Sequence, residues 1–128
     1  MKIKLTSIFV DDQDKALKFY TGVLGFLPKR DIPLGEARWL TVVSPDAPDG
    51  VEIVLEPNGN PAARVFQAAI FEQGIPMTAF EVDELDAEYA RLKKLGVRFS
   101  MEPTDMGQTT VAIFEDTCGN LIQIYQMK

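Results

Sequence analysis

Histidine is absent from this chain of 128 residues, which removes the side chain that most often binds metals and transfers protons near neutral pH. Cysteine occurs once, at Cys118, so no disulfide can form within the chain and a cytoplasmic location is expected. Without a histidine beside it, neither this thiol nor a serine has the usual base that activates a nucleophile. Any metal site or catalytic site must therefore come from other residues.

Long apolar runs are also missing. No stretch approaches the roughly 18 apolar residues of a membrane-spanning helix, and no charged-then-apolar leader is found at the start. The net charge of −6 would repel nucleic acids and anionic membranes, so we expect neither as a partner. The remaining composition, 46% hydrophobic and 25% charged, is typical of a globular protein that can bury a core.

An internal repeat organises the sequence. Gly25 and Gly96 each follow a helix-like segment and lie 71 residues apart, and Glu52 and Gln123 are separated by the same distance in two strand-like segments. This agreement predicts a duplication within a single domain. Its parts are module 1 at about 1–57, a linker helix at about 58–75 and module 2 at about 76–128.

Each module is expected to have the order βαβββ, which makes the fold class α+β. Asp11 or Asp12 can cap a helix that follows a strand over 5–10 and runs to about Val23, and Gly25 would end it. Asn60 before Pro61 predicts another helix start. The other expected elements are strands at about 26–29, 37–43 and 51–56, a helix at 62–72, a strand at 77–82, a helix at 84–95, a strand at 97–101, a loop at 102–107 and strands at 109–114 and 120–126.

This pattern resembles the vicinal oxygen chelate superfamily, which includes glyoxalase I, extradiol dioxygenases and bleomycin-resistance proteins. The similarity rests on Val10-Asp11 and Val82-Asp83, on the glycine that ends each helix, and above all on residues 114–124, FEDTCGNLIQI. Thr117 stands there in place of the family's usual proline. The resemblance implies two tandem βαβββ modules forming a curved, cup-like mixed sheet with helices outside and a ligand inside. It also implies a homodimer, in some members with exchanged modules.

In metal-dependent relatives, one ligand lies on the first strand and another on the last strand of each module. Carried onto this sequence, the four positions are Leu5, Glu52, Met77 and Gln123. Only Glu52 offers a charged oxygen, because leucine has no lone pair and a thioether suits soft metals. A catalytic zinc site usually has three protein ligands. We therefore expect no metal and no cofactor, with Glu56, on the same strand face as Glu52, as the alternative ligand.

Glu52 and Gln123 are the polar candidates for a ligand site. Glu52 would bind a cation or, as a buried carboxylate with a raised pKa, serve as a general base; it is the only catalytic candidate. The alternative is an ordinary half-exposed strand residue. Gln123 can both donate and accept hydrogen bonds and so would contribute specificity.

Arg38 and Trp39 are neighbours in a predicted strand, so only one of them can point into the cup. Arginine there would clamp a carboxylate or phosphate, whereas tryptophan would offer a stacking surface. The sequence leaves this choice open. An apolar lining is predicted from Phe9, Met77, Tyr125 and Met127, with core packing as the alternative, and a lid or a plain surface loop is expected around Met101, Asp105 and Met106.

Three functions remain after these exclusions. The leading hypothesis is a metal-free protein of the glyoxalase/bleomycin-resistance kind that binds and sequesters a small organic molecule. The alternative is a lyase or isomerase of the same superfamily, which would use Glu52 with an atypical metal site or metal-free acid–base catalysis. A third hypothesis is a non-catalytic scaffold with a closed cup.

Overall fold

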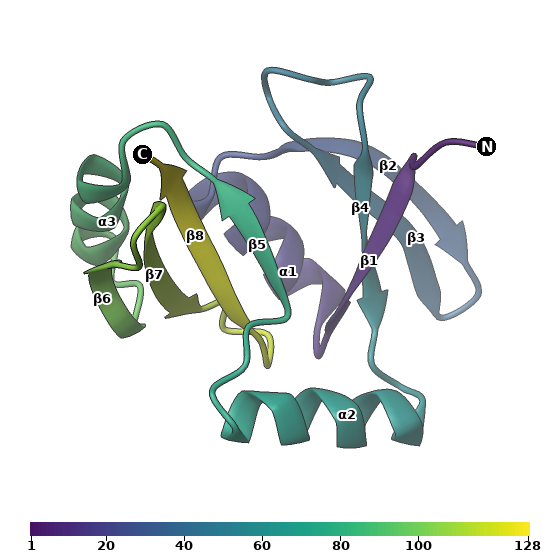
Figure 1. Cartoon of the computed structure of the whole chain (residues 1–128). Coiled ribbons are helices and arrows are strands. Elements are labelled where there is room, and N and C mark those ends of the chain that lie inside the picture. Colours follow the sequence, from purple (N-terminus) through teal and green to yellow (C-terminus); the bar gives the residue numbers. More distant parts are fainter. The chain divides into compact units, whose positions relative to one another are not determined.

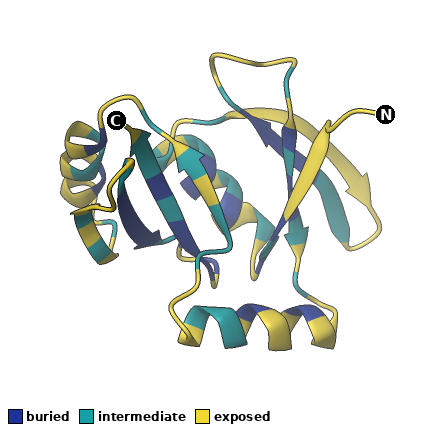
Figure 2. Ribbon diagram, viewed as in Figure 1, coloured by how far each residue is buried: buried dark blue, intermediate teal, exposed yellow.

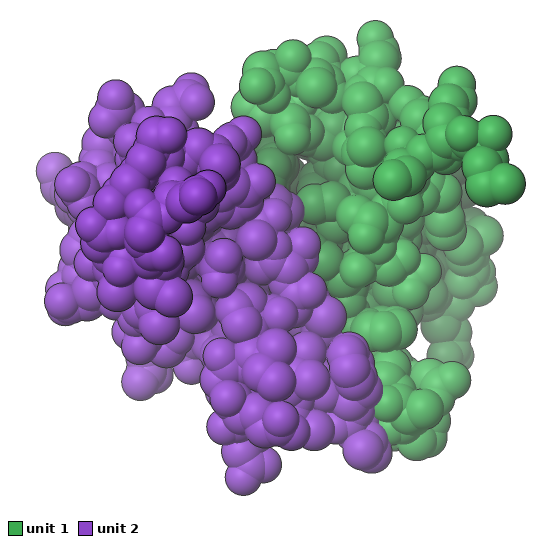
Figure 3. All heavy atoms as spheres, in the orientation of Figure 1, with its two compact units in different colours: residues 1–64 green, residues 65–128 purple.

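The computed structural model describes all residues from 1 to 128, and they form two compact units, Met1–Arg64 and Val65–Lys128 (Figure 3). Each unit contains one four-stranded sheet, with the order β1-β4-β3-β2 in unit 1 and β5-β8-β7-β6 in unit 2 (Figure 1). In both sheets the first strand of the module pairs in parallel with the last, and the other pairs are antiparallel. The predicted α+β class and the repeated βαβββ order are confirmed.

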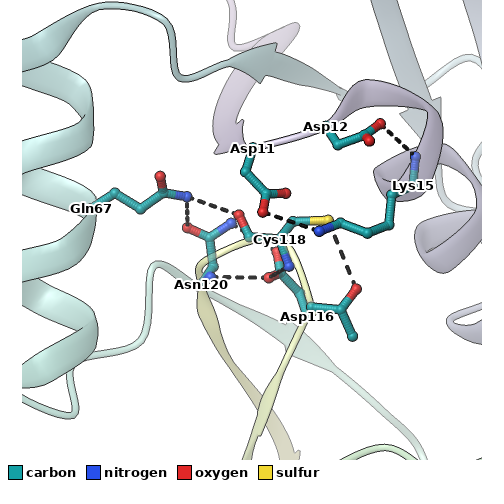
Figure 4. Close-up of polar contacts among 8 residues, drawn as sticks. Asp11, Asp12, Lys15, Gln67, Asp116, Cys118 and Asn120 are labelled. Atoms are coloured by element: carbon teal, nitrogen blue, oxygen red, sulfur yellow. Dashed lines mark hydrogen bonds and ion pairs between the residues drawn. The ribbon is translucent and has the colours of Figure 1, made fainter.

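Local capping chemistry sets the helix boundaries in unit 1. The Asp12 carboxylate accepts a hydrogen bond from the backbone N–H of Lys15 at 3.0 Å, which satisfies one free donor of the first turn (Figure 4). The helix then widens into a π-helical turn and ends before Gly25, whose φ of +89° favours glycine. The elements are β1 (Leu5–Val10), α1 (Gln13–Lys18), η1 (Phe19–Val23), β2 (Leu27–Leu34), β3 (Ala37–Val43) and β4 (Glu52–Pro57).

The core of unit 1 lies between one face of its sheet and the helical segment. Gln13 fixes α1 to this sheet, because its side-chain amide donates to the carbonyls of Arg38 and Leu55 at 2.7 and 2.9 Å. Alternate residues of each strand point to this face. The fully or almost fully buried residues are Ile8, Val10, Ala16, Tyr20, Leu40, Val42 and Leu55.

Unit 2 repeats this arrangement with different caps. The amide oxygen of Gln126 accepts from the backbone N–H of Leu85 at 2.7 Å, so a side chain from β8 satisfies a first-turn donor of α3. Phe114 packs edge-on against Phe99, which in turn meets Tyr89 on α3. The remaining elements are α2 (Pro61–Glu72), β5 (Thr78–Glu81), α3 (Leu85–Lys94), β6 (Phe99–Asp105), β7 (Thr109–Glu115) and β8 (Leu121–Met127). No helix is both long enough and apolar enough to cross a membrane.

Two strands are longer than predicted. β2 continues past residue 29 to Leu34, although it contains Pro28 and Pro33, because it is an edge strand where a missing N–H is tolerated. Figure 2 shows it exposed along its length. β6, the edge strand of unit 2, continues to Asp105 with register shifts around Met101. The expected loop at 102–107 is therefore wrong for residues 102–105.

Candidate ligand-binding faces

Register places a shared set of side chains on one face of the unit 1 sheet, here called the Glu52 face. Glu52 pairs with Leu5 of β1, and Thr41 of β3 pairs with Arg30 of β2. Paired residues share a face, and so do residues two apart on one strand. Since Val43 of β3 pairs with Glu52, the Glu52 face carries Leu5, Phe9, Arg30, Trp39, Thr41, Val43 and Glu52.

Trp39 lies on the Glu52 face, and Arg38 lies on the opposite face. There, Arg38 makes a two-pronged contact with Asp31, with both N···O distances at 3.0 Å, and a further ion pair with Asp14 of α1. The hydrogen bond from Arg38 lowers the pKa of the Asp31 carboxyl, and its two carboxylate partners raise the pKa of Arg38. Arg38 thus joins α1 to β2 and β3.

Glu52 is held by two hydrogen bonds on its own sheet. Its side chain is only 8% exposed, and its Oε1 accepts from the Thr41 hydroxyl at 2.8 Å and from Arg30 Nε at 3.2 Å. The Thr41 hydrogen bond, aided by the charge of Arg30, lowers the pKa of Glu52 even though burial alone would raise it. The expected raised pKa is therefore wrong, and Glu52 is an ionised, weak base at neutral pH.

The residues at the family's metal positions do not fit a divalent cation. The carboxylate oxygen of Glu52 faces the positively charged guanidinium of Arg30, and its register partner Leu5 carries no donor atom. Glu56 shares the strand face but pairs with Phe9, four residues farther along β4. No three Asp, Glu or Cys side chains gather in a group that could hold a metal ion.

Gln123 is the counterpart of Glu52 in unit 2, and its surroundings are apolar. It pairs with Ala79 of β5 and with Ile113 of β7, and it is half-buried. Its amide makes no hydrogen bond within the protein, so its donors and acceptor are available to a ligand. Tyr125 shares this face, whereas Met77 lies before β5 and its backbone N–H donates to Leu121 at 2.8 Å. Ala79, and not Met77, is thus in register with Gln123.

Residues 2–124 match the family model of the Glyoxalase/Bleomycin resistance protein/Dioxygenase superfamily. The chain belongs to this superfamily. It is 59% identical over 126 residues to the uncharacterized protein YurT of Bacillus subtilis (strain 168), covering 98% of this chain and 99% of that protein.

Two solved structures of this fold are also similar in sequence. UcmS2 has a TM-score of 0.84 with 36% identity, covering 98% of this chain and 97% of UcmS2. TnmS3, an antibiotic binding protein from Streptomyces sp. CB03234, has a TM-score of 0.80 with 29% identity, covering 100% of this chain and 97% of TnmS3.

The superfamily's F-x-D-…-G-N segment forms a buried hydrogen-bonded turn that residue types alone did not explain. Asp116 is fully buried and accepts from the backbone N–H groups of Cys118 and Asn120 at 2.8 and 3.0 Å, and from the Asn120 side-chain amide at 2.7 Å (Figure 4). Gln67 of α2 donates to Asn120 Oδ1 at 3.0 Å and to the carbonyl of Cys118 at 3.2 Å. The turn therefore has a structural role and fixes β7, β8 and α2.

The packing and backbone conformation of three residues in this turn could not be predicted from the sequence. A Cβ on Gly119 would lie 2.9 Å from the Gln67 side chain, so glycine allows the helix to approach. Thr117, in the family's proline position, has a φ of +67°, which proline cannot adopt. Cys118 is buried in the same turn.

Proposed function

We propose that this member of the glyoxalase/bleomycin-resistance superfamily is a metal-free binding protein that sequesters a small organic molecule. The observation that carries the proposal is the state of Glu52, which is hydrogen-bonded to Thr41 and paired with Arg30. A carboxylate in this state is a poor metal ligand and a poor general base, so both catalytic alternatives lose their central residue. The similarity to an antibiotic binding protein supports binding as the function.

The side chains available for binding are aromatic and neutral-polar. Trp39 lies half-buried on the Glu52 face of unit 1, where an aromatic ligand would stack on its indole ring. In unit 2, Gln123 offers a free amide and Tyr125 a half-buried ring on the same sheet face. Each face, taken by itself, offers apolar surface with a few polar groups, which is typical of sites for small organic molecules.

Titration calorimetry against a defined panel tests the proposal. The panel contains bleomycin, as a cationic glycopeptide, and polycyclic quinones, as aromatic compounds. We expect at least one compound to bind with one site per chain, and Trp39→Ala to weaken that binding about tenfold through loss of the indole surface. Gln108→Ala, at an exposed position in the β6–β7 hairpin, is the control and should leave affinity unchanged.

The outcomes separate binding from catalysis. Absence of binding by every compound would contradict the proposed function. Turnover of a glyoxalase-type substrate that is lost in Glu52→Gln would favour the lyase or isomerase alternative. The homodimer implied by the resemblance stays a prediction, which light scattering of the purified protein would check.

A further inference from the structure

Arg30 occupies a position on the Glu52 face that neither residue type nor motif singles out. It lies on edge strand β2, where it pairs with Thr41, and its side chain is 51% exposed. Only the Nε group of its guanidinium is used, by Glu52 at 3.2 Å. The two terminal amino groups make no hydrogen bond within the protein, although an arginine can donate five.

The contact with Glu52 fixes the orientation of the Arg30 guanidinium. Glu52 is buried and itself fixed by the buried hydroxyl of Thr41, so the carboxylate has little freedom to move. Bonding through Nε fixes one edge of the planar guanidinium, and the 51% exposure of the side chain leaves the two terminal amino groups accessible to a partner. An arginine oriented in advance loses less side-chain entropy when it binds a partner.

Trp39 is a close neighbour of Arg30 on the same face. Trp39 pairs with Ile32, two residues beyond Arg30 on β2, so Arg30 and Trp39 are diagonal neighbours across the two strands. Such neighbours have separations of about 7–8 Å, which long and aromatic side chains can span. A planar ring system lying on the indole would place its substituents within reach of the guanidinium.

We propose that Arg30 determines ligand specificity, because its free amino groups receive an anionic oxygen of a planar ligand that stacks on Trp39. The ligand class is an aromatic molecule bearing a carboxylate or an ionised phenol. This inference rests on the proposed binding function and adds to it the charge of the ligand. It also replaces the earlier expectation of a cationic ligand, since the Glu52 carboxylate already has its cation in Arg30.

A pair of probes that differ only in charge tests the inference. Anthraquinone carboxylate and its uncharged carboxamide have the same ring system, and calorimetry at pH 7 gives the affinity of each. Because Trp39 is the only tryptophan in the chain, its fluorescence reports binding at this face independently. We expect the carboxylate to bind about tenfold more tightly than the carboxamide, in line with a charge-assisted hydrogen bond.

Substitutions locate the source of this preference. Arg30→Gln should remove this preference. The affinity for the carboxylate probe should fall about tenfold, whereas the affinity for the carboxamide probe should change less than about twofold. Arg30→Lys, which keeps the charge but lacks the fork, should recover only part of the preference. Arg98→Gln is the matched control, since Arg98 also uses Nε to pair with a strand carboxylate, Glu115, at 3.5 Å in unit 2.

Loss of Arg30 leaves Glu52 without its cation, so the single variant could fold poorly. The double variant Arg30→Gln with Glu52→Gln removes both charges and keeps the test intact. Equal affinity of the two probes, or a preference that survives in this double variant, would overturn the inference and leave the proposed function standing. If neither probe binds, and no compound of the panel of bleomycin and polycyclic quinones binds, the proposed function itself is contradicted.

Discussion

The Glu52 face of unit 1 and the corresponding face of unit 2 share a backbone register but differ in chemistry. In unit 1, Glu52 is joined by Thr41, which lies diagonal to it on β3, and by Arg30 on β2. The same register positions in unit 2 hold three uncharged residues, Gln123, Val111 and Thr104. A buried carboxylate needs a donor and a cation, whereas a half-buried amide needs neither. The glutamate, its hydroxyl donor and its arginine therefore occur together in unit 1, and all three are replaced in unit 2.

The turns before the last strands also differ between the units, and here it is unit 2 that has the buried polar side chains. In unit 1, residues 44–50 are mostly exposed and closed by backbone hydrogen bonds from Ala47 to Ser44 and from Gly50 to Ala47. In unit 2, the turn is organised around the buried side chains of Asp116 and Asn120. Unit 1 thus has its buried polar network on the sheet face, and unit 2 has one in the turn.

The largest effect is expected from the turn of unit 2. Asp116→Ala removes a fully buried carboxylate that accepts three hydrogen bonds, so the free energy of unfolding should fall by about 3 kcal/mol. Asp46→Ala, in the exposed turn of unit 1, should change it by less than about 0.5 kcal/mol. Urea denaturation of both variants measures the difference. Equal effects would remove the contrast between the turns.

Transferring the carboxylate to unit 2 is the next largest test. Gln123→Glu places a charge beside Ala79 and Ile113 without a cation, and should cost about 2 kcal/mol at pH 7. Adding Val111→Thr and Thr104→Arg supplies the partners found in unit 1 and should restore about half of the loss. Denaturation of the single and triple variants checks this. A triple variant no more stable than the single one would show that register alone does not reproduce the network.

A smaller, pH-dependent effect is expected at Glu52. Its pKa in the folded protein lies below the ordinary value of 4.5, so the ionised carboxylate stabilises the fold above that pH. This contribution is lost as the pH falls through the folded pKa. Glu52→Gln should therefore be about 1 kcal/mol less stable than the wild type at pH 7, and this difference should shrink as the pH falls through the folded pKa of Glu52. Glu56→Gln on the same strand face is the control, and an identical pH profile for both variants would contradict the assignment.

The smallest effect is a gain at Thr117. A β-branched residue at a φ of +67° is strained, and glycine relieves the strain at the expense of entropy in the unfolded chain. Thr117→Gly should raise the free energy of unfolding by about 0.5 kcal/mol. Thermal and urea denaturation would show it, with Gly25→Ala as the opposite control, since alanine at a φ of +89° should destabilise. A loss of stability in Thr117→Gly would show that the hydroxyl matters more than the backbone.

Most of the fold could be predicted because its signals are local. The cap at Asp12, the helix start at Asn60 and the glycines after two helices each depend on residues within one or two turns. The lengths of β2 and β6 could not be predicted in the same way. Whether a proline ends a strand depends on whether that strand lies at a sheet edge, which is a property of the whole sheet.

The site could be predicted only in part. The repeat predicted equivalent positions for Glu52 and Gln123, and each of them lies on the strand that ends its module, β4 and β8. The partners of Glu52 could not be foreseen, because Thr41 and Arg30 come from strands whose register is set by long-range pairing. The direction of the pKa shift at Glu52 depends on these same partners, so burial alone gave the wrong sign.

The central claim, that the protein binds a small molecule without a metal, is tested most directly by one paired measurement. Elemental analysis of the purified protein is combined with calorimetric titration of the same sample before and after treatment with a chelator. The account predicts no stoichiometric nickel, zinc, manganese or iron, and an affinity that the chelator leaves unchanged. One metal ion per chain, or binding that disappears with the chelator and returns with the metal, would contradict it.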